Sequence, residues 1–224
     1  MEDWPVVGEV SLDLPELPWP LSPSPVEERR DDFELAELRP SWISLRDRRA
    51  EHCTTKERPG WLTLRARGSS LDEPGVVFTG RCQQHLACRA RTLTDPSEGR
   101  GGLAVRLDEH HHYAIEASGT EVRVLACVGS LSTVVAARPV PAGPVVLAVT
   151  ITPPSPSAQG PCAGPDVVSL GAEGPDGTFT ALATLDGRYL STEVAGGFTG
   201  RVIGTYAAED TVHFDWFDYE PLDG

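Results

Sequence analysis

The feature that most constrains the fold is the alternation of short apolar segments with clusters of glycine and proline. Within Glu121–Ala126, the residues Val122, Val124 and Ala126 share one face, which is typical of a strand with one side on a core. Segments of similar character are Trp61–Arg65, Tyr113–Ala117, Val145–Ile151, Val167–Gly171 and Arg201–Tyr206. Helical periodicity is almost absent, so the segments predict an all-β chain.

The glycine and proline clusters are interpreted as turns, because these residues interrupt regular structure. They are Asp72–Gly75, Asp95–Gly102, Ala117–Thr120, Pro141–Pro144, Pro153–Asp166, Glu173–Thr178, Asp186–Arg188 and Ala195–Gly197. Their spacing is close to the 8–12 residues typical of sandwich strands, and a sandwich can occupy a whole chain of 224 residues. We therefore predict an antiparallel β-sandwich of two sheets, closed by a strand over Phe214–Tyr219.

The beginning of the chain differs from the rest. Five prolines between positions 11 and 25 favour an extended, polyproline-like arm. We predict a Pro-rich linker over residues 11–30 and the sandwich over residues 31–224. Residues 1–10 have the character of a strand fragment whose partners are not in this sequence.

Charge and composition exclude several classes of partner. A formal net charge of −14 repels nucleic acid and anionic membranes. No apolar run is long enough to span a membrane, and Glu2-Asp-Trp-Pro after Met1 does not form a secretion signal. The five cysteines include no CxxC pair, which favours free thiols over a zinc ribbon. If Met1 is a natural start, we expect a reducing, cytoplasmic location.

The run His110-His111-His112 is a candidate metal site. On a regular strand, His110 and His112 would point to the same face and could both reach an ion. A third ligand is missing from the sequence pattern, since Asp108 and Glu109 lie close by in the chain. The simpler interpretation is a polar turn before a strand, so we expect neither a metal nor another cofactor.

Carboxylates on the last predicted strand are candidate glycosidase catalysts. A catalytic pair must share one face of the strand, and side chains alternate between the two faces. Asp215 and Asp218 are three positions apart, so regular alternation sends them to opposite faces, whereas Asp218 and Glu220 share one. The chain also has neither the GxSxG motif of serine hydrolases nor a phosphate-binding loop. We assign no catalytic residue.

Most aromatic residues at strand spacing are expected to fill the core. Phe198 differs, because Gly196-Gly197 and Thr199-Gly200 flank it in a loop that lets the ring project outward. Outward-facing aromatic rings are a usual means of holding sugars. Phe198 is therefore the candidate binding residue.

Five blocks in this order resemble the C-terminal sandwich module of glycoside hydrolase family 43 enzymes of the β-xylosidase and α-arabinofuranosidase type. The blocks are Asp31-Asp-Phe with Leu38-Arg-Pro-Ser-Trp42, Arg58–Arg65, Gly101–Tyr113, Gly197–Gly204 and Phe214–Tyr219. The resemblance implies a concanavalin A-like jelly roll. Residues 3–8 look like the end of the five-bladed propeller that precedes this module in the family.

The resemblance implies an accessory role. In the family the catalytic carboxylates belong to the propeller, which hydrolyses chain-end xylose or arabinose units with inversion, and no position of this chain matches them. The position of Phe198 matches an aromatic that reaches the rim of the propeller's pocket. The expected partners are that propeller and xylo- or arabino-oligosaccharides, with a homo-oligomer among the options. The alternative hypothesis is a free-standing carbohydrate-binding lectin.

Overall fold

The computed structural model describes residues 29–45, 51–73, 75–154 and 165–222. The predicted propeller remnant at residues 1–10 lies outside the described residues, as does the linker up to residue 28. The first described strand, β1, covers Arg30–Asp31 and therefore begins one residue before the predicted domain boundary.

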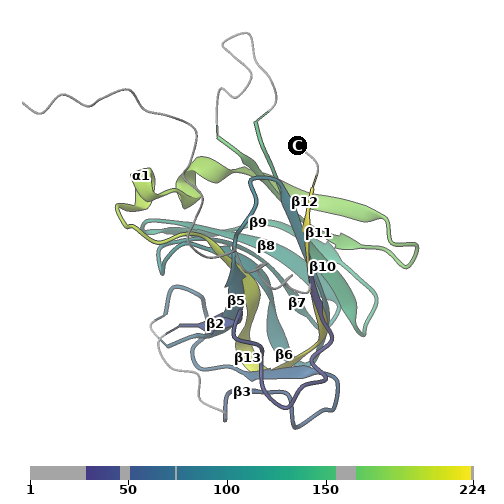
Figure 1. Cartoon of the computed structure of the whole chain (residues 1–224). Helices are drawn as coiled ribbons and strands as arrows, with labels where there is room; N and C mark the ends of the chain where they lie inside the picture. The colour runs from purple at the N-terminus through teal and green to yellow at the C-terminus, as the bar shows by residue number, and fades with distance from the viewer. Residues whose placement is uncertain (1–28, 46–50, 74, 155–164, 223–224) are drawn as a thin grey trace, which may run out of the picture.

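The strands form two antiparallel layers, as predicted (Figure 1). The first layer contains β12, β11, β10, the first half of β6, the second half of β13, and then β4 and β3. These strands are β3 Cys53–Thr54, β4 Leu62–Arg65, β6 Cys88–Arg106, β10 Val145–Thr152, β11 Val167–Glu173, β12 Phe179–Asp186 and β13 Val202–Pro221.

The second layer contains β9, β8, β7, the second half of β6, the first half of β13, and then β5 and β2. The additional strands are β2 Ile43–Ser44, β5 Val77–Cys82, β7 His111–Ser118, β8 Glu121–Val128 and β9 Leu131–Pro139. The only helical elements in the described chain are η1, Gly187–Leu190, and α1, Thr192–Ala195.

Strands β6 and β13 each belong to both layers. The prediction of a turn at Asp95–Gly102 is wrong, because this segment lies inside β6. Strand β6 runs without interruption through that segment. Between Asp95 and Glu98 it has two residues opposite a single residue of β13, since Glu98 pairs with Thr211 and Asp95 with His213. Such a β-bulge bends a strand. The bulge at Pro96 and Ser97, inside the segment predicted as a turn, therefore bends β6 from one sheet into the other.

Apolar side chains from the inner faces of both sheets make the main core. Its largest fully buried members include Tyr113, Phe214, Phe217 and Leu147. A smaller apolar cluster lies on the outer face of the second sheet, where Leu71 and Val76 pack with Ala104, Ala114 and Tyr206. The loop before β5 thus covers part of that sheet.

Strands β5 and β13 approach each other closely where two glycines pair. Gly80 and Gly204 are partners in the register of these strands. A Cβ atom added to Gly204 would lie 2.3 Å from the Cα of Gly80, which is far inside normal contact distance. Both positions require glycine for this reason.

The chain after β1 is fixed by a buried carboxylate. Asp31 accepts hydrogen bonds from the backbone N–H of Phe33 at 3.0 Å and from Nε1 of Trp42 at 2.8 Å. Phe33 has a φ of 53°, a value that residues other than glycine rarely adopt. The hydrogen bonds of Asp31 hold this turn and bring Phe33 and Trp42 into the core.

Candidate functional site

The loop that carries Phe198 connects α1 to β13 at one end of the sandwich. Gly196 ends α1 in the left-handed conformation at φ 74°, and its N–H donates to the carbonyl of Thr192. The side chain of Phe198 is 106% exposed, so it makes almost no contact with the rest of the described chain. The ring projects into solvent, as the flanking glycines indicated.

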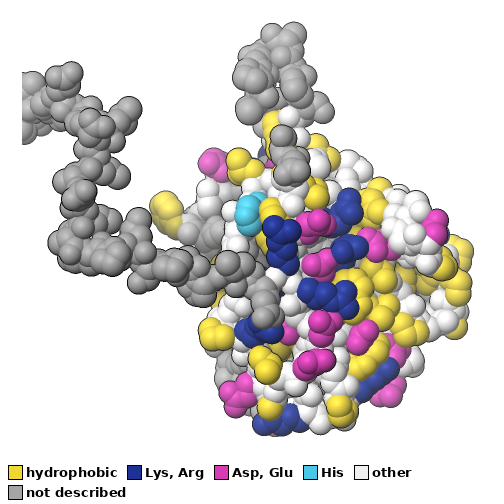
Figure 2. Space-filling view, turned by 45° about the vertical axis from the view of Figure 1, so that its right-hand side comes forward, with side chains coloured by type: hydrophobic (Ala, Val, Ile, Leu, Met, Phe, Trp, Pro, Cys, Tyr) yellow, Lys and Arg dark blue, Asp and Glu magenta, His cyan; other side chains and the backbone are white. Residues whose placement is uncertain are grey.

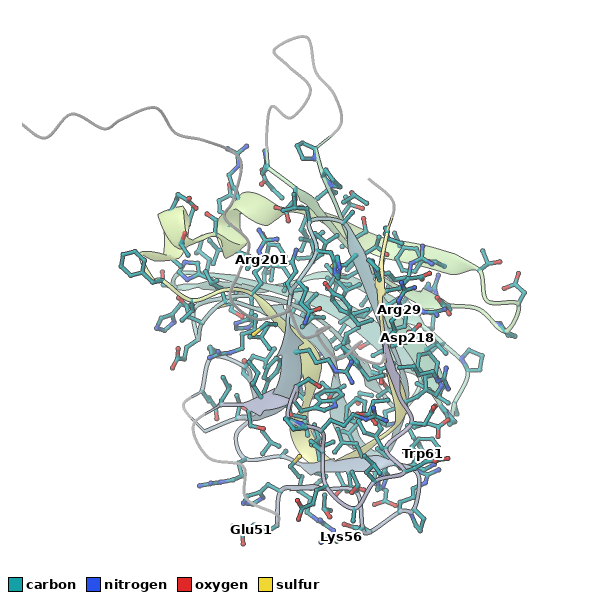
Figure 3. The ribbon with its side chains drawn as sticks, in the orientation of Figure 1. Arg29, Glu51, Lys56, Trp61, Arg201 and Asp218 are labelled. Carbon is teal, nitrogen blue, oxygen red and sulfur yellow. The ribbon has the colours of Figure 1, made fainter. Side chains whose placement is uncertain are left out.

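One arginine holds the base of this loop (Figure 3). The Arg201 guanidinium forms a two-pronged ion pair with the carboxylate of Asp166. It also donates to the carbonyl oxygens of Leu190 at 2.6 Å and Gly187 at 2.7 Å. Arg201 thereby ties the start of β13 to η1 and to the residue before β11. The planar fork of arginine suits such bidentate contacts.

Two further apolar side chains are exposed on the same segment, and the sequence did not single them out. Tyr189 on η1 is 42% exposed and Val194 on α1 is 45% exposed. No sequence signal marked them, because a tyrosine or valine between turn residues is ordinary.

The two candidate metal-binding histidines lie in different environments. Strand β7 begins at His111, so the alternation assumed for His110 and His112 does not apply. His110 is exposed in the turn, where its N–H donates to Asp108, whereas His112 is only 3% exposed. Burial lowers the pKa of His112 to about 4. Within the described residues, no three His, Cys, Asp or Glu side chains are grouped as a metal would require.

The argument that separated Asp215 from Asp218 fails at a second β-bulge. Phe214 pairs with Thr94 and Phe217 with Thr92, so two residues of β13 oppose one residue of β6. Phe214 and Phe217 are consequently both in the main core although they are three positions apart. The bulge breaks the simple alternation, so parity gives no reason to place Asp215 and Asp218 on opposite faces.

Asp215 and Asp218 lie among other charged side chains at the surface. Asp218 forms an ion pair with Arg91, which also lies 3.4 Å from Glu173. Burial raises the pKa of Asp215, and the nearby guanidinium of Arg30 opposes this rise. Figure 2 shows basic and acidic side chains alternating on this side of the molecule, and Figure 3 places Asp218 there, away from Arg201.

The two tryptophans of this charged surface are covered by arginines. The guanidinium of Arg30 lies 4.4 Å from the ring centre of Trp216, and that of Arg58 lies 3.6 Å from the ring centre of Trp61. A cation over an aromatic face is a favourable contact. It also occupies a face on which a sugar would stack.

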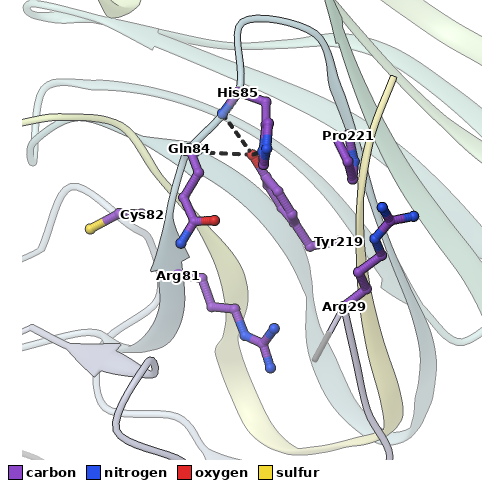
Figure 4. A pocket seen from close by; sticks show the side chains of 7 residues that line it. All are labelled: Arg29, Arg81, Cys82, Gln84, His85, Tyr219 and Pro221. Carbon is purple, nitrogen blue, oxygen red and sulfur yellow. Dashed lines mark hydrogen bonds between the residues drawn. The ribbon is translucent and has the colours of Figure 1, made fainter. Parts of the chain in front are cut away.

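A small pocket lies around Tyr219 (Figure 4). The Tyr219 hydroxyl accepts hydrogen bonds from the backbone N–H groups of Gln84 at 3.0 Å and His85 at 3.1 Å. Arg29 and Arg81 line the pocket, whose volume is about 170 Å³. Typical ligand sites begin at about 300 Å³. Burial raises the pKa of Tyr219 to about 12, so its hydroxyl remains neutral and fixes the turn at residues 83–86.

A wider hollow of about 530 Å³ adjoins Arg201 and Asp166. The charged groups in its wall are already bonded to each other and to η1. The hollow therefore offers a polar ligand fewer free charged groups than its size suggests.

None of the described helices is long and apolar enough to cross a membrane.

The fold and the candidate site define a concanavalin A-like sandwich that presents an aromatic ring on a fixed loop. The chain belongs to the family described as the β-xylosidase C-terminal concanavalin A-like domain, whose model matches residues 30–220. This match confirms the resemblance drawn from the five sequence blocks.

Similar proteins are glycoside hydrolase family 43 enzymes. The chain is 28% identical over 243 aligned residues to the non-reducing end α-L-arabinofuranosidase BoGH43B of Bacteroides ovatus. That alignment covers 99% of this chain and 43% of the relative. This chain therefore spans less than half of the curated relative it matches.

Solved structures share the fold. The GH43B protein of a Bacteroides ovatus xyloglucan locus superposes with a TM-score of 0.75 at 24% identity, covering 94% of this chain and 42% of that one. The xylan β-1,4-xylosidase of Bacillus halodurans superposes with a TM-score of 0.75 at 22% identity, covering 92% and 41%. At these identities the superpositions establish the fold alone.

Proposed function

We propose that this chain is the accessory domain of a glycosidase and acts beside a five-bladed propeller that carries the catalytic carboxylates. In this proposal the Phe198 ring completes the rim of a pocket that accepts chain-end xylose or arabinose units. The similar enzymes include an α-L-arabinofuranosidase and a β-1,4-xylosidase, which supports this substrate class.

The observation that carries the proposal is a fully exposed aromatic ring on a loop whose base is fixed. An exposed phenylalanine gains nothing from the hydrophobic effect in an isolated domain. The ion pair of Arg201 with Asp166 holds the loop that presents it. A ring held ready in this way fits a contact with a partner domain or a sugar.

The first test is an assay of the isolated chain on aryl β-xyloside and aryl α-arabinofuranoside. We expect no turnover, because the proposal assigns no catalytic group to this chain. Turnover that survives further purification and follows the protein would refute the accessory role.

The second test uses a longer chain in which the propeller precedes these residues. Phe198→Ala should lower kcat/KM about twofold to tenfold, equivalent to the roughly 0.5–1.5 kcal/mol of an aromatic contact. Leu35→Ala is the matched control, because Leu35 is also exposed, at 52%, and its carbonyl is bonded to Thr55 beside β3. Equal activity of the two variants would remove the role given to Phe198.

The lectin alternative makes a different prediction for the isolated chain, namely saturable binding of xylo-oligosaccharides. We expect flat calorimetric titrations, because arginines cover the rings of Trp61 and Trp216. A saturable binding heat would favour the lectin hypothesis.

The proposal also places the chain in a reducing, cytoplasmic setting, which the four described cysteines support, since all four are free.

A further inference from the structure

The pocket around Tyr219 has a positively charged wall (Figure 4). Its lining includes the side chains of Arg29, Arg81 and His85, and none of the described residues in the wall is an Asp or a Glu. The whole chain has 33 acidic residues against 19 lysines and arginines, so this wall is the reverse of the chain's average. A concave surface lined by one sign of charge concentrates ions of the opposite sign. The pocket therefore favours an anion.

Arg81 of β5 is held in place in the wall of this pocket. Its side chain is only 6% exposed. The guanidinium lies 5.0 Å from the ring centre of Trp42 and 5.6 Å from that of Phe217. Because these rings already restrict its movement, Arg81 loses little freedom when a ligand binds.

The buried carboxylate of Asp31 lies beside Arg81 but is shared among several donors. Its two oxygens accept hydrogen bonds from the backbone N–H of Phe33 and from Nε1 of Trp42. A guanidinium nitrogen of Arg81 lies 3.5 Å from Asp31, and Nε of Arg39 lies 3.7 Å from it. Both distances are longer than the roughly 2.7–2.9 Å of a charge-assisted hydrogen bond. Asp31 can balance only one of these two positive charges.

Arg29 brings a further guanidinium to the pocket from the segment before β1. Its carbonyl oxygen accepts a hydrogen bond from the backbone N–H of Tyr219 at 2.9 Å, which fixes its backbone. Its side chain is exposed and forms no ion pair with an acidic residue of the described chain. Figure 4 shows Arg81 on one side of Tyr219 and Arg29 on the other. Guanidinium groups on two sides of a pocket suit the several oxygens of one anion.

The volume of the pocket limits the ligand to a small group. A water molecule occupies about 30 Å³ of liquid, so about 170 Å³ corresponds to roughly five or six waters. We propose that this pocket binds a small oxyanion, a carboxylate or a phosphate group, between Arg29 and Arg81. This inference does not depend on the proposed function.

The experiment is an NMR titration of the 224-residue chain with sodium acetate and, separately, with sodium phosphate, at constant ionic strength. The reporters are the backbone N–H groups of Gln84 and His85, which donate to the Tyr219 hydroxyl in the wall of the pocket. We expect saturable shifts with a Kd of about 1–10 mM, which two charge-assisted hydrogen bonds can supply. The probe with the lower Kd identifies whether the site prefers a carboxylate or a phosphate group.

Two variants separate binding at the pocket from a general effect of charge. Arg29→Gln should raise the Kd at least about fivefold, because it removes a charge-assisted hydrogen bond while leaving the core intact. Arg67→Gln is the matched control, because Arg67 is also exposed and without an ion pair in the described chain, and it should leave the Kd unchanged.

Three results would overturn the proposal. One is the lack of saturable shifts up to about 50 mM of either probe, several times the expected Kd. Another is an equal Kd for Arg29→Gln and Arg67→Gln. The third is an equal response to sodium chloride, which would show an effect of ionic strength alone. All three would leave the test of Phe198 untouched.

Discussion

Arg201 is expected to be the residue on which the geometry of the Phe198 loop depends. Its guanidinium contacts Asp166, Leu190 and Gly187, and the side chains of Arg201 and Asp166 are 13% and 22% exposed. Breaking a buried ion pair by removing one partner costs about 3–5 kcal/mol. Water can reach part of Asp166, so we expect Arg201→Met to lower the free energy of unfolding by about 2–4 kcal/mol.

The assay is urea unfolding followed by tryptophan fluorescence, together with amide hydrogen exchange of residues 196–200. Arg188→Met is the matched control, because Arg188 pairs with Asp186 while its own side chain is 57% exposed. Exposed pairs contribute about 0–1 kcal/mol, so this control should be nearly silent. If Arg201→Met costs no more than Arg188→Met, or exchange in the loop does not accelerate, the anchoring role is wrong.

Two further predictions concern the sheets. The pKa of His112 is lowered by burial from 6.5 to about 4, so its contribution to stability is complete above about pH 6.5. About 3 kcal/mol is lost as the pH falls toward 4, and urea unfolding should show this loss in the wild type relative to His112→Gln. Identical pH profiles of the two proteins would contradict it. Gly204→Ala should cost more than about 2 kcal/mol, because its Cβ would meet the backbone of Gly80, whereas Gly200→Ala has open space and should be tolerated. Equal melting temperatures of these two variants would show that β5 and β13 can separate.

Much of the fold followed from the sequence, because the alternation of apolar residues is the direct record of a sheet with one buried face. The segments at Val145–Ile151 and Val167–Gly171 became β10 and β11 almost without change. Strand β9 was missed because both of its faces are exposed, so no alternation marks it. The long course of β6 was missed because Pro96 and the glycines after it mark a turn and a bulge equally well.

The candidate site was only partly accessible from sequence. The glycines around Phe198 predicted an exposed loop, because flexible residues on both sides of an aromatic residue let its ring project outward. The contact of Arg201 with Asp166 joins residues 35 positions apart across two strands, and no local pattern marks it. The argument about Asp215 and Asp218 failed because alternation holds only while the register is unbroken, and a β-bulge leaves no reliable mark in the sequence.

The sharing of β13 between both sheets has a consequence for how the chain folds. The last strand of the described chain pairs with β6, β5, β4 and β1, including Arg30 with Asp218. Contacts between residues so far apart in sequence form slowly, because a long loop must close before they are made. Neither sheet is complete until the twenty residues of β13 have been synthesised, so the domain should reach its native state only after translation has passed β13. Until then the inner faces of the other strands remain uncovered, which makes the growing chain dependent on protection from aggregation.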